Sequence, residues 1–151
     1  MAYDDPRKAD PEKFIAGEEH VKGAQKEWKQ YTPLAEYKLL HINENNGEWV
    51  TLDRIKKGAV LNRHLHKGAI RAYIIKGKFT YRTDRVLEPG DFLYEPLSAH
   101  HPATECLEDA EVISIYSGAL EFLDDDDRTV SILDWEWYKR TEAGLDPVEV
   151  F

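Results

Sequence analysis

Two stretches of this chain decide its fold: GAVLNRHLH, covering Gly58–His66, and GDFLYEP, covering Gly90–Pro96. The first ends in a His-x-His pair, His64 and His66, and the second is followed by a further histidine, His101. On a β-strand, residues two positions apart project from the same face, so His64 and His66 can hold one ion from one side. Imidazole suits zinc, iron, copper and nickel. The pattern therefore predicts a protein with a single metal ion.

The composition predicts one ordinary globular domain. The chain has 151 residues, of which 42% are hydrophobic and 32% are charged. Its net charge of -9 and the lack of a basic stripe argue against nucleic-acid binding. No apolar run approaches the roughly 20 residues of a membrane span, and the polar N-terminus lacks an apolar signal region. The single cysteine, Cys106, has no partner for an internal disulfide. These features predict a cytoplasmic protein that binds neither nucleic acid nor membranes.

The chain divides into four expected segments. We expect a polar tail over residues 1–12, an N-terminal edge segment over 13–36, a barrel over 37–123, and a C-terminal helix and tail over 124–151. The barrel region consists of short β-rich runs separated by turn signals, a pattern typical of a sandwich or barrel.

The strands that the pattern predicts are Tyr37–Ile42, Glu48–Ile55, Val60–Leu65, Arg71–Ile75, Lys78–Arg82, Asp91–Glu95, Pro102–Glu105, Val112–Tyr116 and Ala119–Leu123. The stretch after Asp134 predicts a short helix, with Asp134 as its N-cap and Gly144 as its stop. We expect its aromatic residues to cover the barrel or to form a dimer contact. The fold class predicted is all-β.

The spacing of glycines, histidines and a proline resembles the two sequence motifs of the cupin superfamily. The residues that match are Gly58, His64, His66 and Gly77 for the first motif, and Gly90, Asp91, Pro96 and His101 for the second. The resemblance implies a double-stranded β-helix, or jelly roll, with His64, His66 and His101 as metal ligands inside one end of the barrel. The register from Pro96 favours His101 over its neighbour His100, for which we expect an exposed or hydrogen-bonding role.

One position departs from the cupin pattern. The acidic ligand position, seven residues before Gly77, holds Ile70, and counting back along the chain finds no Asp or Glu nearby that could replace it. The expected ligands are then three neutral imidazoles. Three neutral ligands leave the charge of a bound dication uncompensated. The metal ion is then a strong Lewis acid that can bind a chelating anion.

This pattern resembles the three-histidine cupin dioxygenases that cut carbon–carbon bonds, namely the 2,4'-dihydroxyacetophenone dioxygenase group and the acetylacetone-cleaving enzymes. Arg63, Lys76, Tyr94, Glu95 and residues 118–124 contribute to the resemblance. It implies an enzyme with Fe(II), for which zinc, nickel and manganese are the alternatives. The implied substrates are O2 and a small β-dicarbonyl or α-hydroxyketone, chelated on the iron as its enolate.

Two other functions stay open at this point. Three histidines and a water molecule are also the typical ligands of a catalytic zinc ion. The first alternative is therefore an oxygen-independent hydrolase or isomerase. A cupin can also be a metal-binding sensor without enzymatic activity. The resemblance and the aromatic C-terminal segment are compatible with a homodimer.

Further candidate residues surround the histidines. Glu95 corresponds to a carboxylate that the acetylacetone-cleaving relatives place behind a metal ligand, although an exposed strand end is the alternative for it. Arg71 or Arg82 could orient a chelating oxyanion, although exposed arginines are common. Strand alternation predicts a mostly apolar substrate pocket. The substrate-binding candidates are Val60, Ile70, Ala72 and Tyr81.

Overall fold

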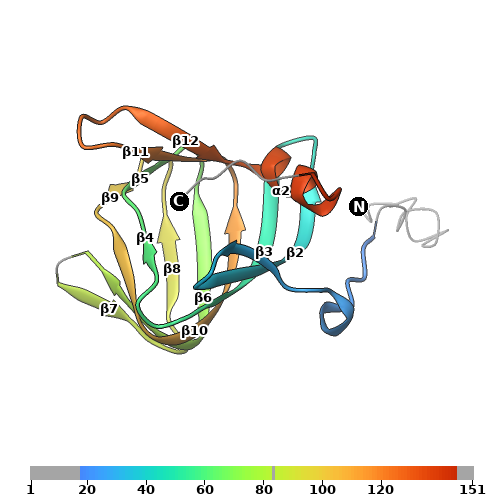
Figure 1. The fold of residues 1–151 in the computed structure, drawn as a ribbon, viewed down its shortest axis with the longest axis horizontal. Coiled ribbons are helices and arrows are strands. Elements are labelled where there is room, and N and C mark those ends of the chain that lie inside the picture. The colour runs from blue at the N-terminus through green and yellow to red at the C-terminus, as the bar shows by residue number, and fades with distance from the viewer. Residues whose placement is uncertain (1–17, 83, 146–151) are drawn as a thin grey trace, which may run out of the picture.

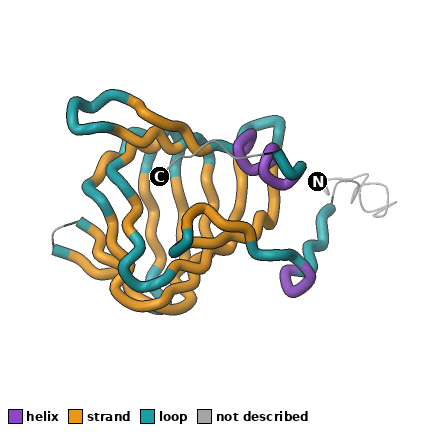
Figure 2. Tube along the Cα trace, in the orientation of Figure 1, coloured by secondary structure: helices purple, strands orange, loops and turns teal. Residues whose placement is uncertain are grey.

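The computed structural model describes residues 18–82 and 84–145, and the side chain of His101 also lies outside this description. The tail predicted over residues 1–12 and the chain end over 146–151 therefore lie outside the described residues. The fold consists of two β-sheets and a short C-terminal helix (Figures 1 and 2). No helix in the described ranges is long and apolar enough to cross a membrane.

The larger sheet has eight strands among the described residues. Their hydrogen-bonded order is β1-β2-β3-β10-β6-β7, while β4 pairs with β10 and β8 pairs with β6. The strands are β1 (Lys29–Thr32), β2 (Ala35–Asn43), β3 (Glu48–Ile55), β4 (Val60–Leu61), β6 (Ile70–Tyr81), β7 (Arg85–Leu87), β8 (Phe92–Glu95) and β10 (Thr104–Tyr116).

The smaller sheet has the order β12-β11-β5-β9. Its strands are β12 (Thr129–Leu133), β11 (Leu120–Leu123), β5 (His64–His66) and β9 (His100–His101). Figure 1 shows β12 and β11 along the top of the molecule, across from the long strands β6 and β10 of the larger sheet. The chain enters the small sheet at β5, β9 and β11 and returns to the large sheet in between, and every pairing is antiparallel. The all-β jelly roll implied by the sequence is confirmed.

Two strands are longer than the sequence pattern predicts. β6 runs unbroken over Ile70–Tyr81, where the glycine at position 77 predicts a break, and β10 likewise spans Thr104–Tyr116. Gly77 has φ +84° and lies against β10, where a Cβ would come 2.5 Å from Ala110 Cα. The register between the strands shifts at this point, where Asp109 and Ala110 of β10 lie opposite Gly77, so β10 carries a bulge that bends the pair instead of ending it. The inward-facing residues of β6 alternate with exposed ones on both sides of the bulge.

The sequence pattern also fails to predict β1, β7, β9 and β12, each of which has five residues or fewer. Short edge strands carry too few alternating positions to be recognised. β1 pairs with β2 at one edge of the large sheet.

The C-terminal helix α2 spans Trp135–Glu142, and its N-cap is Asp134, as predicted. The Asp134 side chain accepts a hydrogen bond from the backbone N–H of Trp137 at 2.9 Å. Trp137 and Tyr138 are buried and pack in one cluster with Tyr37 and Trp49, so they cover the barrel of their own chain. Figure 1 shows α2 beside the upper ends of β2 and β3.

Candidate metal centre and cavity

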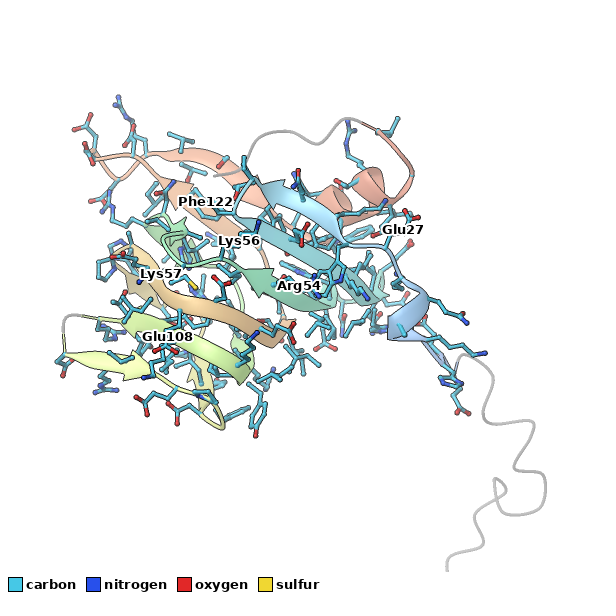
Figure 3. All side chains as sticks on the ribbon, turned by 60° about the horizontal axis from the view of Figure 1, so that its bottom comes forward. Glu27, Arg54, Lys56, Lys57, Glu108 and Phe122 are labelled. Atoms are coloured by element: carbon cyan, nitrogen blue, oxygen red, sulfur yellow. The ribbon has the colours of Figure 1, made fainter. Side chains whose placement is uncertain are left out.

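The His-x-His pair lies on β5 and faces the interior. His64 and His66 are buried, while Leu65 between them is partly exposed, as strand alternation requires. Their Nε2 atoms lie 3.0 Å apart. Phe122 of β11, labelled in Figure 3, packs against the His64 ring with 5.5 Å between ring centroids. The pair is therefore held in a packed interior position with both Nε2 atoms converging on one point.

One tautomer of His64 is fixed by the backbone. Its Nδ1 lies 2.7 Å from the carbonyl oxygen of Asn62. A carbonyl oxygen can only accept, so Nδ1 must carry the hydrogen, and Nε2 of a neutral ring then holds a lone pair. A backbone carbonyl behind a histidine ligand is the usual arrangement in metal sites. His64 is thus prepared to donate its Nε2 lone pair to a metal ion.

The separation of the two Nε2 atoms also fits a shared ion. Two nitrogens bound at about 2.1 Å with an angle near 90° lie about 3.0 Å apart, and this bond length is typical for imidazole on a first-row dication. The donors are neutral nitrogens, which zinc and iron both accept. The observed distance of 3.0 Å equals this separation. The geometry of His64 and His66 therefore fits two adjacent ligand positions.

The predicted third ligand lies on the neighbouring strand. The backbone of His101 on β9 is the register partner of His64, while His100 pairs with Leu65 and is exposed. The side chain of His101 lies outside the described residues. Among the side chains that the structure describes, no three His, Cys, Asp or Glu residues are arranged to hold one ion. The ligand role of His101 stays a prediction.

Glu95 lies beside the histidine pair, but not where the sequence predicts it. Its side chain is buried, and Oε2 lies 3.3 Å from Nε2 of His66. The carboxylate thus contacts the nitrogen that faces His64, whereas a group behind a ligand would contact Nδ1. Glu95 is the register partner of Ile70, at the end of β8. Its alternative interpretation as an exposed strand end is wrong.

Tyr81 lies close to the same carboxylate. Burial raises the pKa of its phenol, and the charge of Glu95 and a hydrogen bond to it add to this rise, while Arg82 acts in the opposite direction. Tyr81 is buried at the end of β6. The phenol therefore keeps its proton near neutral pH and can hold the Glu95 carboxylate in place.

A cavity of about 570 Å³ lies next to these residues. His64, His66 and Glu95 are part of its wall. The rest of the wall is mostly apolar, and the substrate-binding candidates Val60, Ile70, Ala72 and Tyr81 all line it. Val60 is half exposed and the other three are buried. The predicted apolar pocket is therefore present, and its volume is typical of a small-molecule site.

Neither candidate arginine lines this cavity. Arg71 alternates with the inward-facing Ile70 and Ala72, so its side chain lies on the outer face of the sheet. There it donates a hydrogen bond to Ser117 and lies over the Tyr94 ring. Arg82 is exposed in the turn after β6, with φ 58°. The expectation that one of them orients an oxyanion disagrees with these positions. No lysine or arginine is found among the described residues that form the wall.

The cavity wall carries another buried carboxyl that the sequence analysis does not single out. Asp53 on β3 lines the cavity, and Thr51 precedes it on the same face. The sequence carries no signal for this, because the alternation of the apolar Val50 and Leu52 with polar residues predicts that Asp53 faces outward, whereas the structure buries it. The neighbouring Arg54 points outward, over the Trp28 ring at 4.0 Å, and is labelled in Figure 3.

Comparison with known proteins agrees with this fold. Residues 16–121 match the profile of the ChrR cupin-like domain. A comparison with curated proteins gives no match. Among solved structures, a proposed acetylacetone dioxygenase from Methylibium petroleiphilum PM1 is 25% identical, with a TM-score of 0.78 over 83% of this chain and 94% of that one.

Two other solved structures share the fold at lower identity. The acetylacetone dioxygenase from Acinetobacter johnsonii is 19% identical, with a TM-score of 0.78 over 85% of this chain and 93% of that one. An RmlC-like cupin protein from Ralstonia eutropha JMP134 is 24% identical, with a TM-score of 0.72 over 86% and 91% of the two chains. The described jelly roll is thus found in proteins with an assigned reaction and in one without.

Proposed function

Because this chain belongs to the ChrR cupin-like domain family, we propose that it is a metal-dependent cupin dioxygenase. It cleaves a carbon–carbon bond in a small β-dicarbonyl or α-hydroxyketone with O2. The observation that carries the proposal is the convergence of His64 Nε2 and His66 Nε2 to 3.0 Å on the wall of a large apolar cavity. The similarity to the Methylibium petroleiphilum protein supports the reaction type.

We assign the metal to His64, His66 and His101. Directly opposed residues of an antiparallel pair share one face of a sheet, and His101 is the register partner of His64. We propose Fe(II) as the native ion, with zinc, nickel and manganese as the alternatives. Bound Fe(II) would supply open positions for the two oxygens of an enolate and the redox chemistry of O2.

The residues of the chain bind the ketone and control its protons. The apolar wall around Ile70 and Ala72 excludes water, which strengthens the electrostatic interactions at the histidine pair. The Glu95 carboxylate, held next to His66, is placed to take a proton from the carbon between the carbonyl groups as the enolate forms. Tyr81 holds that carboxylate in position.

The reaction balances without a further reductant. An enolised 1,3-diketone and O2 give a carboxylic acid and a 1,2-dicarbonyl compound, with one oxygen atom of O2 in each product. Of the four electrons that reduce O2, two come from the carbon–carbon bond that breaks and two from the C–H bond that the central carbon loses on enolisation. The reaction therefore needs no thiol as reductant. The one cysteine, Cys106, forms hydrogen bonds to backbone carbonyls, and burial raises the pKa of its thiol to about 11.

A second candidate function is an oxygen-independent zinc hydrolase or isomerase. The observation in its favour is the position of Glu95 Oε2, 3.3 Å from His66 Nε2, where a carboxylate can serve as general base for a water molecule. The two functions differ in their need for O2.

Oxygen uptake tests the proposal. Protein loaded anaerobically with Fe(II) is mixed with acetylacetone, longer 1,3-diketones and α-hydroxyketones in air-saturated buffer, and dissolved O2 is followed with an electrode. We expect uptake with at least one compound and none in the His64→Ala variant. The exposed-residue variant His100→Ala is the matched control and keeps the activity. Equal turnover of a ketone under nitrogen would support the zinc function instead, and no uptake at full iron occupancy would exclude the dioxygenase.

A further inference from the structure

Asp53 forms a second polar position on the wall of the cavity. It is 6% exposed and lines the cavity from β3. Glu95 on β8 and Asp53 on β3 are separated by β6 and β10, because the order across the sheet is β8, β6, β10, β3. Neighbouring strands lie about 4.8 Å apart, and the register row of Glu95 meets β3 at Trp49, four residues from Asp53, so the two carboxyls are separated both across the sheet and along its strands. They mark two different parts of one cavity.

Hydrogen bonds position the Asp53 carboxyl from two sides. Tyr31 Oη donates to Oδ1 and Thr51 Oγ1 donates to Oδ2, both at 3.0 Å. Tyr31 Oη also lies 2.6 Å from Tyr138 Oη. Because the one hydroxyl hydrogen of Tyr31 points to Asp53, Tyr138 must be the donor in that second bond. Strands β1 and β3 thus each direct a hydrogen-bond donor to this carboxyl, and helix α2 supports the β1 donor through Tyr138.

Within the described part of the chain, the carboxyl of Asp53 has hydrogen-bond donors but no cationic partner. No lysine, arginine or histidine in the described ranges forms a salt bridge with it. Burial therefore raises the pKa of Asp53 to about 7, although the hydrogen bonds from Thr51 and Tyr31 lower it. Near neutral pH the carboxyl exists in both forms. A ligand hydroxyl suits both, because it accepts a hydrogen bond from the acid and donates one to the carboxylate.

Tyr116 lies near both carboxyls, which belong to different register rows of the sheet. Tyr116 of β10 lies in the register row that joins Trp49 of β3 to Ile70 of β6, and Ile70 in turn pairs with Glu95. Burial raises the pKa of the Tyr116 phenol, and the charges of both Asp53 and Glu95 add to the rise. Tyr116 therefore lies within electrostatic reach of both groups and also lines the cavity.

The cavity is larger than a five-carbon diketone requires. Pockets of roughly 300–1,000 Å³ bind drug-sized ligands, and this one measures about 570 Å³. A molecule as small as acetylacetone, bound at the histidine pair, would leave the Asp53 end unfilled. A longer ligand, with a chelating group, an apolar middle and a second polar group, could contact both the histidine pair and Asp53.

We propose that Asp53 anchors the far end of the substrate, and that the substrate is an elongated enolisable ketone with an apolar middle and a terminal hydroxyl. This rests on the proposed function for the histidine end. Asp53 contacts the substrate away from the reacting atoms and is a specificity-determining residue, with Tyr31 and Thr51 holding its carboxyl in position.

Calorimetric binding under nitrogen tests the proposal on the full chain loaded with Fe(II). The two probes are nonane-2,4-dione and 9-hydroxynonane-2,4-dione, which differ only in the terminal hydroxyl. We expect the hydroxylated probe to bind the native protein about fivefold more tightly, the effect of one net hydrogen bond. In Asp53→Leu this preference disappears, while Ser114→Ala, which removes another buried hydroxyl from the same wall, keeps it.

A second variant covers the case in which Asp53→Leu does not fold. In Asp53→Asn one of the two oxygens that accept from Tyr31 and Thr51 becomes an NH2 group, which can donate to a ligand hydroxyl but cannot accept from it, so the preference for the hydroxylated probe should fall to about twofold. Equal affinity of the native protein for both probes would overturn the anchoring role of Asp53 while leaving the proposed function in place. Failure of both probes to bind would overturn the proposed function and the anchor with it. An unchanged preference in either Asp53 variant would also contradict the proposal.

Discussion

Ile70 and Glu95 are register partners on β6 and β8, so the apolar side chain at the expected acidic ligand position lies directly beside a carboxylate from another strand. Both are buried on the cavity wall. The negative charge that the chain lacks at position 70 is thus present nearby, and it contacts His66. The centre combines neutral donors with one adjacent carboxylate.

This pairing predicts a strong effect of an acidic residue at position 70. Ile70→Glu would bury a second carboxylate against Glu95, and we expect it to destabilise the protein by about 3 kcal/mol or more. The conservative change Ile70→Val should cost about 1 kcal/mol. Urea unfolding measures both. Adding Glu95→Gln to Ile70→Glu should recover part of the loss, and a double variant no more stable than Ile70→Glu would contradict the proximity of the two groups.

Metal binding should depend on His64 and His66 and not on His100. A ligand that binds only the folded protein at a hundred times its dissociation constant stabilises it by about 2.7 kcal/mol. We therefore expect Fe(II), added anaerobically, to raise the Tm of the native protein and of His100→Ala, but not of His64→Ala or His66→Ala. Differential scanning calorimetry measures this. The same rise in Tm in His64→Ala would show that the ion binds elsewhere.

Asp53 should make the stability of the protein depend on pH. Burial raises its pKa from 3.8 to about 7 in the folded state, so between these values the folded protein binds more protons than the unfolded chain. The free energy of unfolding therefore falls as the pH rises from about 4 to about 7, by at most about 4 kcal/mol. The adjacent phenols of Tyr31 and Tyr138 stay neutral over this range, because burial raises the pKa of each.

Asp53→Asn should remove this slope. Urea unfolding at a series of pH values measures it, and the exposed carboxylate variant Asp126→Asn serves as control and should keep the slope of the native protein. If Asp53→Asn and the native protein show parallel pH profiles, the carboxyl of Asp53 is not buried as described.

Gly77 should tolerate no side chain. It has φ +84°, and a Cβ would come 2.5 Å from Ala110 Cα on β10. Gly90 has a similar φ of +92°, but a Cβ added there would meet no atom within 4 Å. We expect Gly90→Ala to cost about 1 kcal/mol for the backbone conformation alone, and Gly77→Ala to cost at least twice as much. Equal losses of stability in urea unfolding would show that the strands do not approach so closely.

The sequence predicts the architecture well because the relevant signals are local. The Glu48–Ile55 strand is confirmed with the bounds predicted, and the Asp134 cap of helix α2 is confirmed by its hydrogen bond. Strand alternation alone places Ile70 and Ala72 on the cavity wall. The motifs bring His64 and His66 together because their spacing is set by the strand itself.

What the sequence does not predict depends on pairing between distant segments. A search along the chain near Ile70 finds no carboxylate, yet strand pairing brings Glu95 beside it across 25 positions. The hydrogen bond to Asp53 from Tyr31, which Tyr138 supports, likewise joins residues that are far apart in the sequence. The same alternation that turns Ile70 inward turns Arg71 outward, a consequence that was available from the sequence.

Isotope labelling tests the central claim most directly. Protein loaded with Fe(II) is supplied with ¹⁸O2 and a diketone that it consumes, and the products are trapped at once and analysed by mass spectrometry. The account predicts one labelled oxygen atom in the carboxylic acid and one in the dicarbonyl fragment. Products whose oxygen comes from water, formed equally well without O2, would contradict it.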